Sequence, residues 1–185
     1  MFDTSKLTEI EREIITADQI EKRVTEIAEE ITNEFKDSKN DLVLVGILKG
    51  SVIFLTDLCR KISLPLTFDF ISVSSYGDNT TSTGDVRILK DLDQKIEGKD
   101  VVIVEDIIDT GYTLNYLVKN LKSKGASCVK IASLLDKKER RVIEVPVDYI
   151  GFDIPDEFVV GYGIDFAQKY RNLPFIGIVK REAYE

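Results

Sequence analysis

The segment Val101–Thr113 concentrates the side chains of this sequence that are best suited to chemistry. An apolar run, VVIV, leads into two adjacent carboxylates, Glu105 and Asp106, and a third follows at Asp109. The turn Thr110-Gly111-Tyr112-Thr113 follows and opens a predicted helix. The free N–H groups at the start of this helix and the two threonine hydroxyls form a cradle that can bind an anion. Gly111 has no side chain, so a ligand can approach the backbone closely. A sugar phosphate suits both halves, with its phosphate in the cradle and its vicinal hydroxyls on the paired carboxylates. The alternative is a buried strand that ends in solvated acids.

The types of residue that are missing narrow the chemistry further. The sequence contains no histidine, which excludes Ser-His-Asp triads, Cys-His pairs and histidine metal sites. Acid–base work must therefore come from carboxylates, lysine or tyrosine. Cys59 and Cys128 are isolated from each other and from other metal ligands, so we expect buried, reduced thiols.

Length and charge limit the class of protein. A chain of 185 residues fits one domain, which we expect to span 1–185. The net charge of −8 argues against a nucleic-acid-binding surface, although a small polyanion can still bind beside local cations. The longest apolar runs, such as Leu42–Leu48, are far short of the roughly 20 residues that a membrane span needs. With no signal-like apolar stretch at its start, the chain is predicted to be cytoplasmic and to have no membrane partner.

Alternating strands and helices must position these side chains. Thr16–Gln19 reads as a capping box that opens a helix with apolar spacing as far as Phe35, and further helices are expected from Ser51 and from about Thr113 to Lys124. Apolar or alternating runs predict strands at 42–48, 66–74, 101–109, 127–135, 147–154 and 174–180. This order predicts an α/β fold with a mainly parallel sheet covered by helices on both faces. Ligands bind such sheets at the carboxyl ends of the strands, where the motifs above fall.

A family resemblance follows from the same segment. VVIVEDIIDTGYT closely resembles the phosphoribosyl pyrophosphate loop of the hypoxanthine-guanine phosphoribosyltransferases. The resemblance covers nearly the whole chain after residue 40, through four further segments in the family's order: 48–51, 75–76 leading into STGDV, 134–137, and IPDEFVVGYGIDFAQKYRNLP. It implies the type I phosphoribosyltransferase fold, with a small hood formed by the N- and C-terminal segments.

The resemblance also implies an activity. Its members transfer the phosphoribosyl group of phosphoribosyl pyrophosphate to hypoxanthine or guanine, giving IMP or GMP and pyrophosphate in purine salvage. The implied cofactor is Mg²⁺, and the implied assembly is a homodimer or homotetramer.

The family's site residues carry over onto matching positions. Glu105 and Asp106 are implied to hold the ribose hydroxyls, directly or through a metal, and Asp109 to act beside purine N7 as general base or charge stabiliser. The 5′-phosphate is implied to bind Thr110, Gly111, Tyr112 and Thr113. The purine contacts are Lys137 at the 6-oxo group, Phe158 stacked on the ring, and the Val159 backbone. The pyrophosphate contacts are Lys49, Gly50, Ser75, Tyr76 and Arg171, and the metal ligands are Glu105, Asp106 and Asp165.

Three local features bear on this assignment. Members of the family often carry a cis peptide bond between the residues that match Leu48 and Lys49. Ser51 stands where many members have a second glycine, which leaves the local geometry open. The polar segment 75–84 is the natural lid over the site, or else a surface loop.

Each assigned side chain also has an ordinary structural interpretation. Phe158 can belong to the core, and Lys137 lies in the charged run DKKERR, where it can be solvated and where Lys138 is an alternative register. Arg171 can form a surface ion pair, and Asp165 can cap a turn.

Two rival functions remain open at this level. A regulatory homologue that binds the sugar pyrophosphate and controls RNA or DNA should have a basic face or an added domain, whereas this chain is acidic. An enzyme for adenine or a pyrimidine is disfavoured by Lys137 together with Phe158 and Val159.

Overall fold

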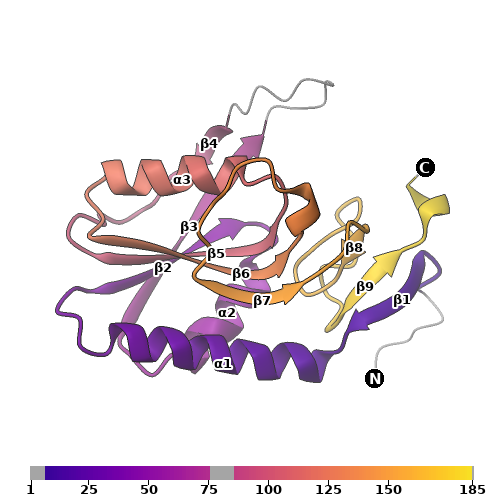
Figure 1. Cartoon of the computed structure of the whole chain (residues 1–185), viewed down its shortest axis with the longest axis horizontal. Coiled ribbons are helices and arrows are strands. Elements are labelled where there is room, and N and C mark those ends of the chain that lie inside the picture. The colour runs from indigo at the N-terminus through magenta and orange to yellow at the C-terminus, as the bar shows by residue number, and fades with distance from the viewer. Residues whose placement is uncertain (1–6, 76–85, 185) are drawn as a thin grey trace.

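The computed structural model describes residues 7–75 and 86–184, and its centre is a six-stranded sheet in the order β4-β3-β2-β5-β6-β7 (Figure 1). The strands β2, β3, β5, β6 and β7 are parallel to their neighbours, and only β4 runs antiparallel, to β3. The strands of this sheet are β2 (Leu42–Leu48), β3 (Leu66–Ser75), β4 (Val86–Lys90), β5 (Asp100–Ile108), β6 (Cys128–Asp136) and β7 (Tyr149–Asp153). The prediction of a mainly parallel sheet is confirmed.

Three helices cover the two faces of this sheet, α1 (Ala17–Phe35), α2 (Val52–Lys61) and α3 (Tyr112–Ser123) (Figure 1). Alternate residues of the central strands face opposite sides, so both faces of β2 and β5 need a cover. Leu44 and Val102 pack with α1 and α2, whereas Val45 and Val101 pack with α3. This two-sided burial explains why the central strands read as continuous apolar runs rather than alternating ones.

A second, three-stranded sheet joins the two ends of the chain in the order β1-β9-β8, beside the carboxyl ends of the large sheet (Figure 1). It consists of β1 (Ile10–Ile15), β8 (Val159–Val160) and β9 (Ile176–Val179), all antiparallel. This small sheet is the predicted hood. The sequence did not mark β1, β4 or β8 as strands, because β8 has two residues and the others are short and interrupted by charges.

Most predicted boundaries are confirmed within a few residues. The capping box is present, with Gln19 N–H donating to Thr16 Oγ1 at 3.2 Å and Thr16 N–H donating to Gln19 Oε1 at 2.8 Å. Cys59 and Cys128 are free thiols, as expected, but only partly buried. The expectation of full burial was wrong because Cys128 opens β6 at the edge of the fold, and Cys59 lies beside the buried face of α2. Of the helices in residues 7–75 and 86–184, none combines the length and apolar character that crossing a bilayer requires.

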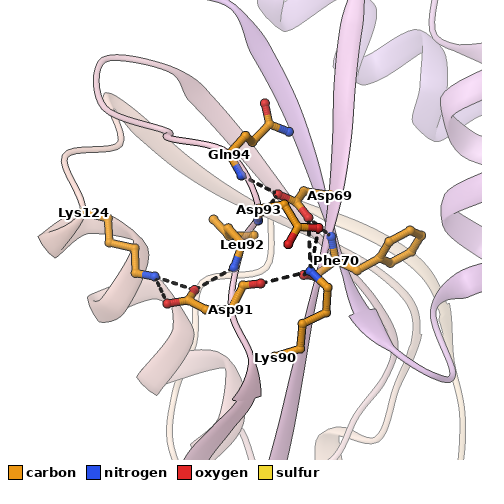
Figure 2. A network of polar contacts seen from close by, with 8 residues as sticks. All are labelled: Asp69, Phe70, Lys90, Asp91, Leu92, Asp93, Gln94 and Lys124. Carbon is orange, nitrogen blue, oxygen red and sulfur yellow. Dashed lines mark hydrogen bonds and ion pairs between the residues drawn. The ribbon is translucent and has the colours of Figure 1, made fainter.

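A buried carboxylate ties β3 to the connection between β4 and β5 (Figure 2). Asp69 accepts hydrogen bonds from the N–H groups of Phe70 at 2.7 Å, Asp93 at 2.8 Å and Gln94 at 3.2 Å, and Lys90 Nζ lies 3.6 Å away. Burial alone would raise the pKa of Asp69, but these donors and the ammonium group outweigh burial and lower the pKa from its ordinary value. The carboxylate is therefore bound in its charged form.

The first prediction concerns the stability that Asp69 contributes. Asp69→Asn should reduce the free energy of unfolding by about 2 kcal/mol at pH 7, because three backbone donors lose a charged acceptor. A carboxyl whose pKa falls on folding stabilises the protein above its unfolded-state pKa, about 3.9, and loses that effect as pH falls through the lower folded-state value. The difference in unfolding free energy between variant and wild type, measured by urea unfolding, should therefore become smaller below about pH 4.

Asp93→Asn is the matched control, because the Asp93 side chain is 81% exposed and, within residues 7–75 and 86–184, pairs with Lys90 alone, at 3.1 Å. Its loss should be under about 1 kcal/mol. Equal losses in the two variants, or a gap that does not change with pH, would contradict the assignment.

Candidate active site

The carboxyl ends of β5 and β6 bring two of the predicted side chains together. β5 runs parallel to β2 on one side and β6 on the other, so the segments that follow the three strands leave the same edge of the sheet. The register pairs Ile108 with Asp136, and Lys137 N–H donates to the Ile108 carbonyl at 2.9 Å. Asp109 and Lys137, each the first residue after its strand, are therefore neighbours.

The turn after β5 presents an uncapped helix start. Gly111 precedes α3 with φ of +88°, and no side chain caps the helix. A β-carbon at this position would lie 2.4 Å from the Ile143 carbonyl oxygen, so both the backbone angle and the space require glycine. The N–H groups of Val142 and Ile143 donate to the Thr110 carbonyl at 3.0 Å each, which binds the segment after β6 to the turn. Thr110 and Thr113 line a pocket of about 220 Å³ at this helix start, which suits an anion.

Glu105 and Asp106 are adjacent at the carboxyl end of β5 and have different neighbours. Glu105 lines the 220 Å³ pocket together with Ile47 and Thr113. Asp106 points toward the end of β2, where a β-carbon at Gly50 would lie 1.6 Å from Asp106 Oδ2. Only glycine at position 50 leaves room for this carboxylate.

The charged forms of these two carboxylates are unfavourable without a cation or hydrogen-bond donors beside them. Burial, and then the neighbouring Asp106 carboxylate, raise the pKa of Glu105 well above its ordinary value. Hydroxyl donors or a cation would favour its charged form. The donor set is all oxygen and fits Mg²⁺, which commonly takes one or two carboxylates and completes its shell with substrate and water. Within residues 7–75 and 86–184, no three His, Cys, Asp or Glu side chains converge on one point, so the substrate would have to supply further ligands.

The segment after β2 has the geometry that the family resemblance implied. The Leu48–Lys49 peptide bond is cis. Ser51, where the pattern departs from a second glycine, has φ of −71° and donates from its buried hydroxyl to the Ile47 carbonyl at 2.6 Å. Since this φ is ordinary for any residue, serine does not disturb the turn.

The segment 161–171 packs against this turn and contributes a charged cluster. A β-carbon at Gly163 would lie 2.0 Å from the Gly50 carbonyl oxygen, so the two backbones touch. Arg171 Nη2 lies 2.7 Å from Asp165 Oδ1, while Asp165 Oδ2 accepts from the Gln168 N–H at 2.8 Å. Asp165 thus caps a turn and Arg171 forms an ion pair, as the ordinary interpretations allowed. A ligand of either residue would have to compete with this pair.

Lys49 reaches the same cluster. Its ammonium group donates to Gln168 Oε1 at 3.3 Å, and Arg171 Nη2 lies 3.4 Å from the same oxygen. Three of the residues predicted to bind pyrophosphate or metal, Lys49, Asp165 and Arg171, therefore lie together. Of the remaining pyrophosphate residues, Ser75 ends β3 with its backbone paired to Val86. Tyr76 and the rest of the predicted lid lie outside the described residues.

The purine-contact predictions are also placed. The Lys137 side chain is 14% exposed with Nζ 3.6 Å from Asp156 Oδ1, whereas Lys138 is 62% exposed and pairs with Asp153 at 2.8 Å. Lys137 is therefore the less exposed of the two lysines, and it contacts the segment just before Phe158. Phe158 is 39% exposed, so the core interpretation is wrong for it, while Val159 is buried.

Two charged residues that the sequence did not single out connect these groups. Arg140 Nε donates to Asp109 Oδ1 at 3.0 Å, and Arg140 Nη1 lies 3.7 Å from Asp156 Oδ2. Arg140 belongs to the charged run that reads as a solvated face, and Asp156 lies two residues before Phe158. Only the fold brings them together, because no local pattern links residues 109, 140 and 156.

The largest cavity described, about 580 Å³, lies elsewhere, between α1, α2 and residues 162–174. Its lining includes Asp57 and Arg60 but none of the predicted site residues. By volume alone, this cavity would be the preferred candidate for a ligand site. The smaller pocket has the glycine turn, the uncapped helix and the clustered carboxylates, and these features of chemistry decide between the two.

Comparison with known proteins agrees with the geometry. The sequence model of the phosphoribosyl transferase domain matches residues 12–167. The hypoxanthine-guanine phosphoribosyltransferase of Bacillus subtilis is 46% identical over 177 residues, which are 96% of this chain and 97% of that protein. A crystal structure of a hypoxanthine phosphoribosyltransferase from Staphylococcus aureus superposes with a TM-score of 0.94 at 42% identity, over the whole of both chains.

Some relatives are much longer. The bifunctional protein TilS/HprT of Listeria monocytogenes is 48% identical over 176 residues, which are 95% of this chain. The chain spans 27% of the length of that protein.

The second prediction tests the turn before α3. Gly111→Ala should lower the free energy of unfolding by about 3 kcal/mol, because it adds left-handed backbone strain and a clash with the Ile143 carbonyl. Gly98→Ala is the matched control: φ there is +72°, but nothing lies within 4 Å of the new carbon. Its loss should be about 1 kcal/mol. Equal losses in urea unfolding would show that the contact with Ile143 does not matter.

Proposed function

This chain belongs to the hypoxanthine-guanine phosphoribosyltransferase family, and we propose that it makes IMP or GMP from hypoxanthine or guanine and phosphoribosyl pyrophosphate. The observation that carries the proposal is the adjacency of Asp109 and Lys137 at the ends of neighbouring parallel strands, beside the uncapped start of α3. A nucleotide needs this combination, because its phosphate and its base must be held at the same time.

In the proposed site the protein holds the sugar by three kinds of contact. The 5′-phosphate binds the N–H groups and hydroxyls of residues 110–113, in the pocket that Thr110 and Thr113 line. Glu105 and Asp106 accept hydrogen bonds from the ribose hydroxyls, which offsets the cost of charging Glu105 in its partly buried position. The start of α3 and the end of β5 therefore hold the phosphate and the ribose ring together.

The base lies between the sugar and the hood. Lys137 donates to the 6-oxo oxygen, which selects oxopurines over adenine, because adenine carries a donor at that place. Phe158 stacks on the purine ring, which its partly exposed side chain allows, and the backbone of the next residue, Val159, contacts the purine edge. Asp109 accepts the proton from the purine ring or stabilises the positive charge that develops on it.

The reaction forms a bond between a purine nitrogen and C1 of the ribose and breaks the bond from C1 to pyrophosphate. The transition state resembles an oxocarbenium ion, as in glycoside hydrolysis. Lys49, Gly50, Ser75, Tyr76 and Arg171 hold the leaving pyrophosphate, through charged side chains and backbone N–H groups. The protein acts mainly by positioning the two substrates and by stabilising charge.

Mg²⁺ is proposed as the cofactor, with Glu105 and Asp106 as ligands on the ribose side, Asp165 as a ligand on the pyrophosphate side, and substrate oxygens completing the shell. When bound, it neutralises charge on the leaving pyrophosphate. Asp165 would first have to exchange its ion pair with Arg171 for the metal. The exchange would also release the Arg171 guanidinium to contact pyrophosphate.

Three further points stay proposals. We propose one phosphoribosyltransferase domain over residues 1–185, a cytoplasmic location, and a homodimer or homotetramer. The family match over residues 12–167 supports the first. The second rests on the apolar pattern of the sequence, and the third on family resemblance.

The third prediction tests the activity. Purified protein with phosphoribosyl pyrophosphate and Mg²⁺ should form nucleotide from hypoxanthine or guanine and none from adenine, because only the oxopurines accept from Lys137. A parallel reaction with a chelator in place of Mg²⁺ should lose most of its rate. Tight binding of the sugar pyrophosphate with no turnover of any base would contradict the proposal and favour a regulatory protein.

The fourth prediction tests Asp109. Asp109→Asn should lower kcat by about 10²- to 10⁴-fold with unchanged binding of phosphoribosyl pyrophosphate, since the amide cannot take a proton or carry the balancing charge. The measurement is steady-state kinetics with hypoxanthine, together with direct titration of the sugar pyrophosphate. Asp153→Asn is a suitable control, because Asp153 is a carboxylate at the end of β7 whose one ion pair among the described residues is with exposed Lys138. A kcat that stays within about twofold of wild type would remove Asp109 from the mechanism.

A further inference from the structure

Four charged side chains form an alternating row across the proposed purine site. Asp109 is followed by Arg140 at 3.0 Å, then Asp156 at 3.7 Å, then Lys137 at 3.6 Å. The two ends of the row are the groups proposed to contact purine N7 and the 6-oxo group. The two middle members come from the short helix Lys138–Arg140 and from the segment before β8. Nothing in the proposed mechanism yet uses them.

We propose that Arg140 and Asp156 are positioning residues that hold Asp109 and Lys137 apart, at the spacing that the N7–O6 edge of a 6-oxopurine requires. This inference rests on the proposed function, since it assigns a role within the same site. N7 and the 6-oxo oxygen lie on one edge of the purine. A carboxylate and an ammonium group must therefore face that edge side by side without neutralising each other.

The reason for a spacer is the attraction between the two end groups. Asp109 and Lys137 are neighbours at the strand ends, and opposite charges so placed tend to pair directly. Such a pair would occupy the very atoms that the purine needs. In the part of the chain that the structure describes, the two do not pair with each other, and each is held by a partner of the opposite charge. Arg140 and Asp156 are those partners.

The geometry of Arg140 suits this task. Its planar guanidinium uses Nε toward Asp109 and Nη1 toward Asp156, so one rigid fork binds two carboxylates. Only Oδ1 of Asp109 is engaged. Oδ2 accepts no hydrogen bond from the described residues, and it is the atom left to meet the purine. A lysine at position 140 would keep the charge but not the fork.

A role in stability is a poor explanation for the same contacts. The Arg140 side chain is 49% exposed and that of Asp156 is 43% exposed. Exposed pairs of this kind contribute little to folding because water and salt screen them. The segment itself is held by other bonds, from the backbone of residues 142 and 143 to Thr110 and from Arg141 to buried Asp136. Replacing Arg140 should therefore leave the fold intact.

The fifth prediction compares Arg140→Ala with Lys138→Ala, its matched control. Both remove an exposed cation from the same short helix, but Lys138 pairs with Asp153 outside the row. Arg140→Ala should raise the KM for hypoxanthine and lower kcat, together by roughly 10- to 100-fold in kcat/KM, because the purine contacts lose their spacing. The KM for phosphoribosyl pyrophosphate should stay within about twofold, and Lys138→Ala should match wild type in all three parameters.

Two more variants separate positioning from charge. Arg140→Lys should recover only part of the loss, because it restores the charge without the fork. Arg140→Ala combined with Asp156→Ala should lose less than the product of the two single losses, since the two residues share one contact in the row.

The outcomes are distinguishable. Arg140→Ala kinetics equal to those of Lys138→Ala would overturn the inference while leaving the proposed function intact. A matching rise in the KM for phosphoribosyl pyrophosphate would also overturn it, because it would show that Arg140 acts through the phosphate turn. Wild-type protein with no turnover of either oxopurine would contradict the proposed function itself.

Discussion

The parallel register between β5 and its neighbours is the constraint on which the rest of the site depends. Because β5 lies between β2 and β6, the three following segments emerge at one edge and must share it. Pairing of Ile108 with Asp136 places Asp109 beside Lys137. The close contact between Gly50 and Asp106 places the turn after β2 beside the end of β5. A shift of one residue in this register would turn the carboxylates at the end of β5 to the opposite face.

The second constraint is charge. The chain carries a net charge of −8, and the proposed site itself gathers Glu105, Asp106, Asp109 and Asp165. A polyanionic substrate binds such a surface only where local groups reverse the field. The helix start, Lys49, Arg171 and a bound cation do this for the phosphates. Around the proposed purine site, positive and negative side chains alternate from Asp109 to Lys137, so neither sign of charge dominates.

Much of this architecture could be predicted from local pattern. Continuous apolar runs mark strands buried on both faces, and the sequence from Glu105 to Thr113 marks the strand–turn–helix that holds the anion cradle. The hood was predicted only as a resemblance, because the two-residue β8 carries no signal of its own. Arg140 and Asp156 could not be predicted, since their meaning depends on a contact across 16 positions of sequence within otherwise ordinary charged segments.

The most direct test of the central claim is a crystal structure of this protein with bound IMP. We expect the 5′-phosphate to bind the N–H groups of residues 110–113. We also expect N7 to lie within hydrogen-bonding distance of Asp109 and the 6-oxo oxygen to accept from Lys137. Arg140 should still lie between Asp109 and Asp156. A nucleotide found instead in the 580 Å³ cavity between α1 and α2, with the ends of β5 and β6 empty, would contradict the central claim.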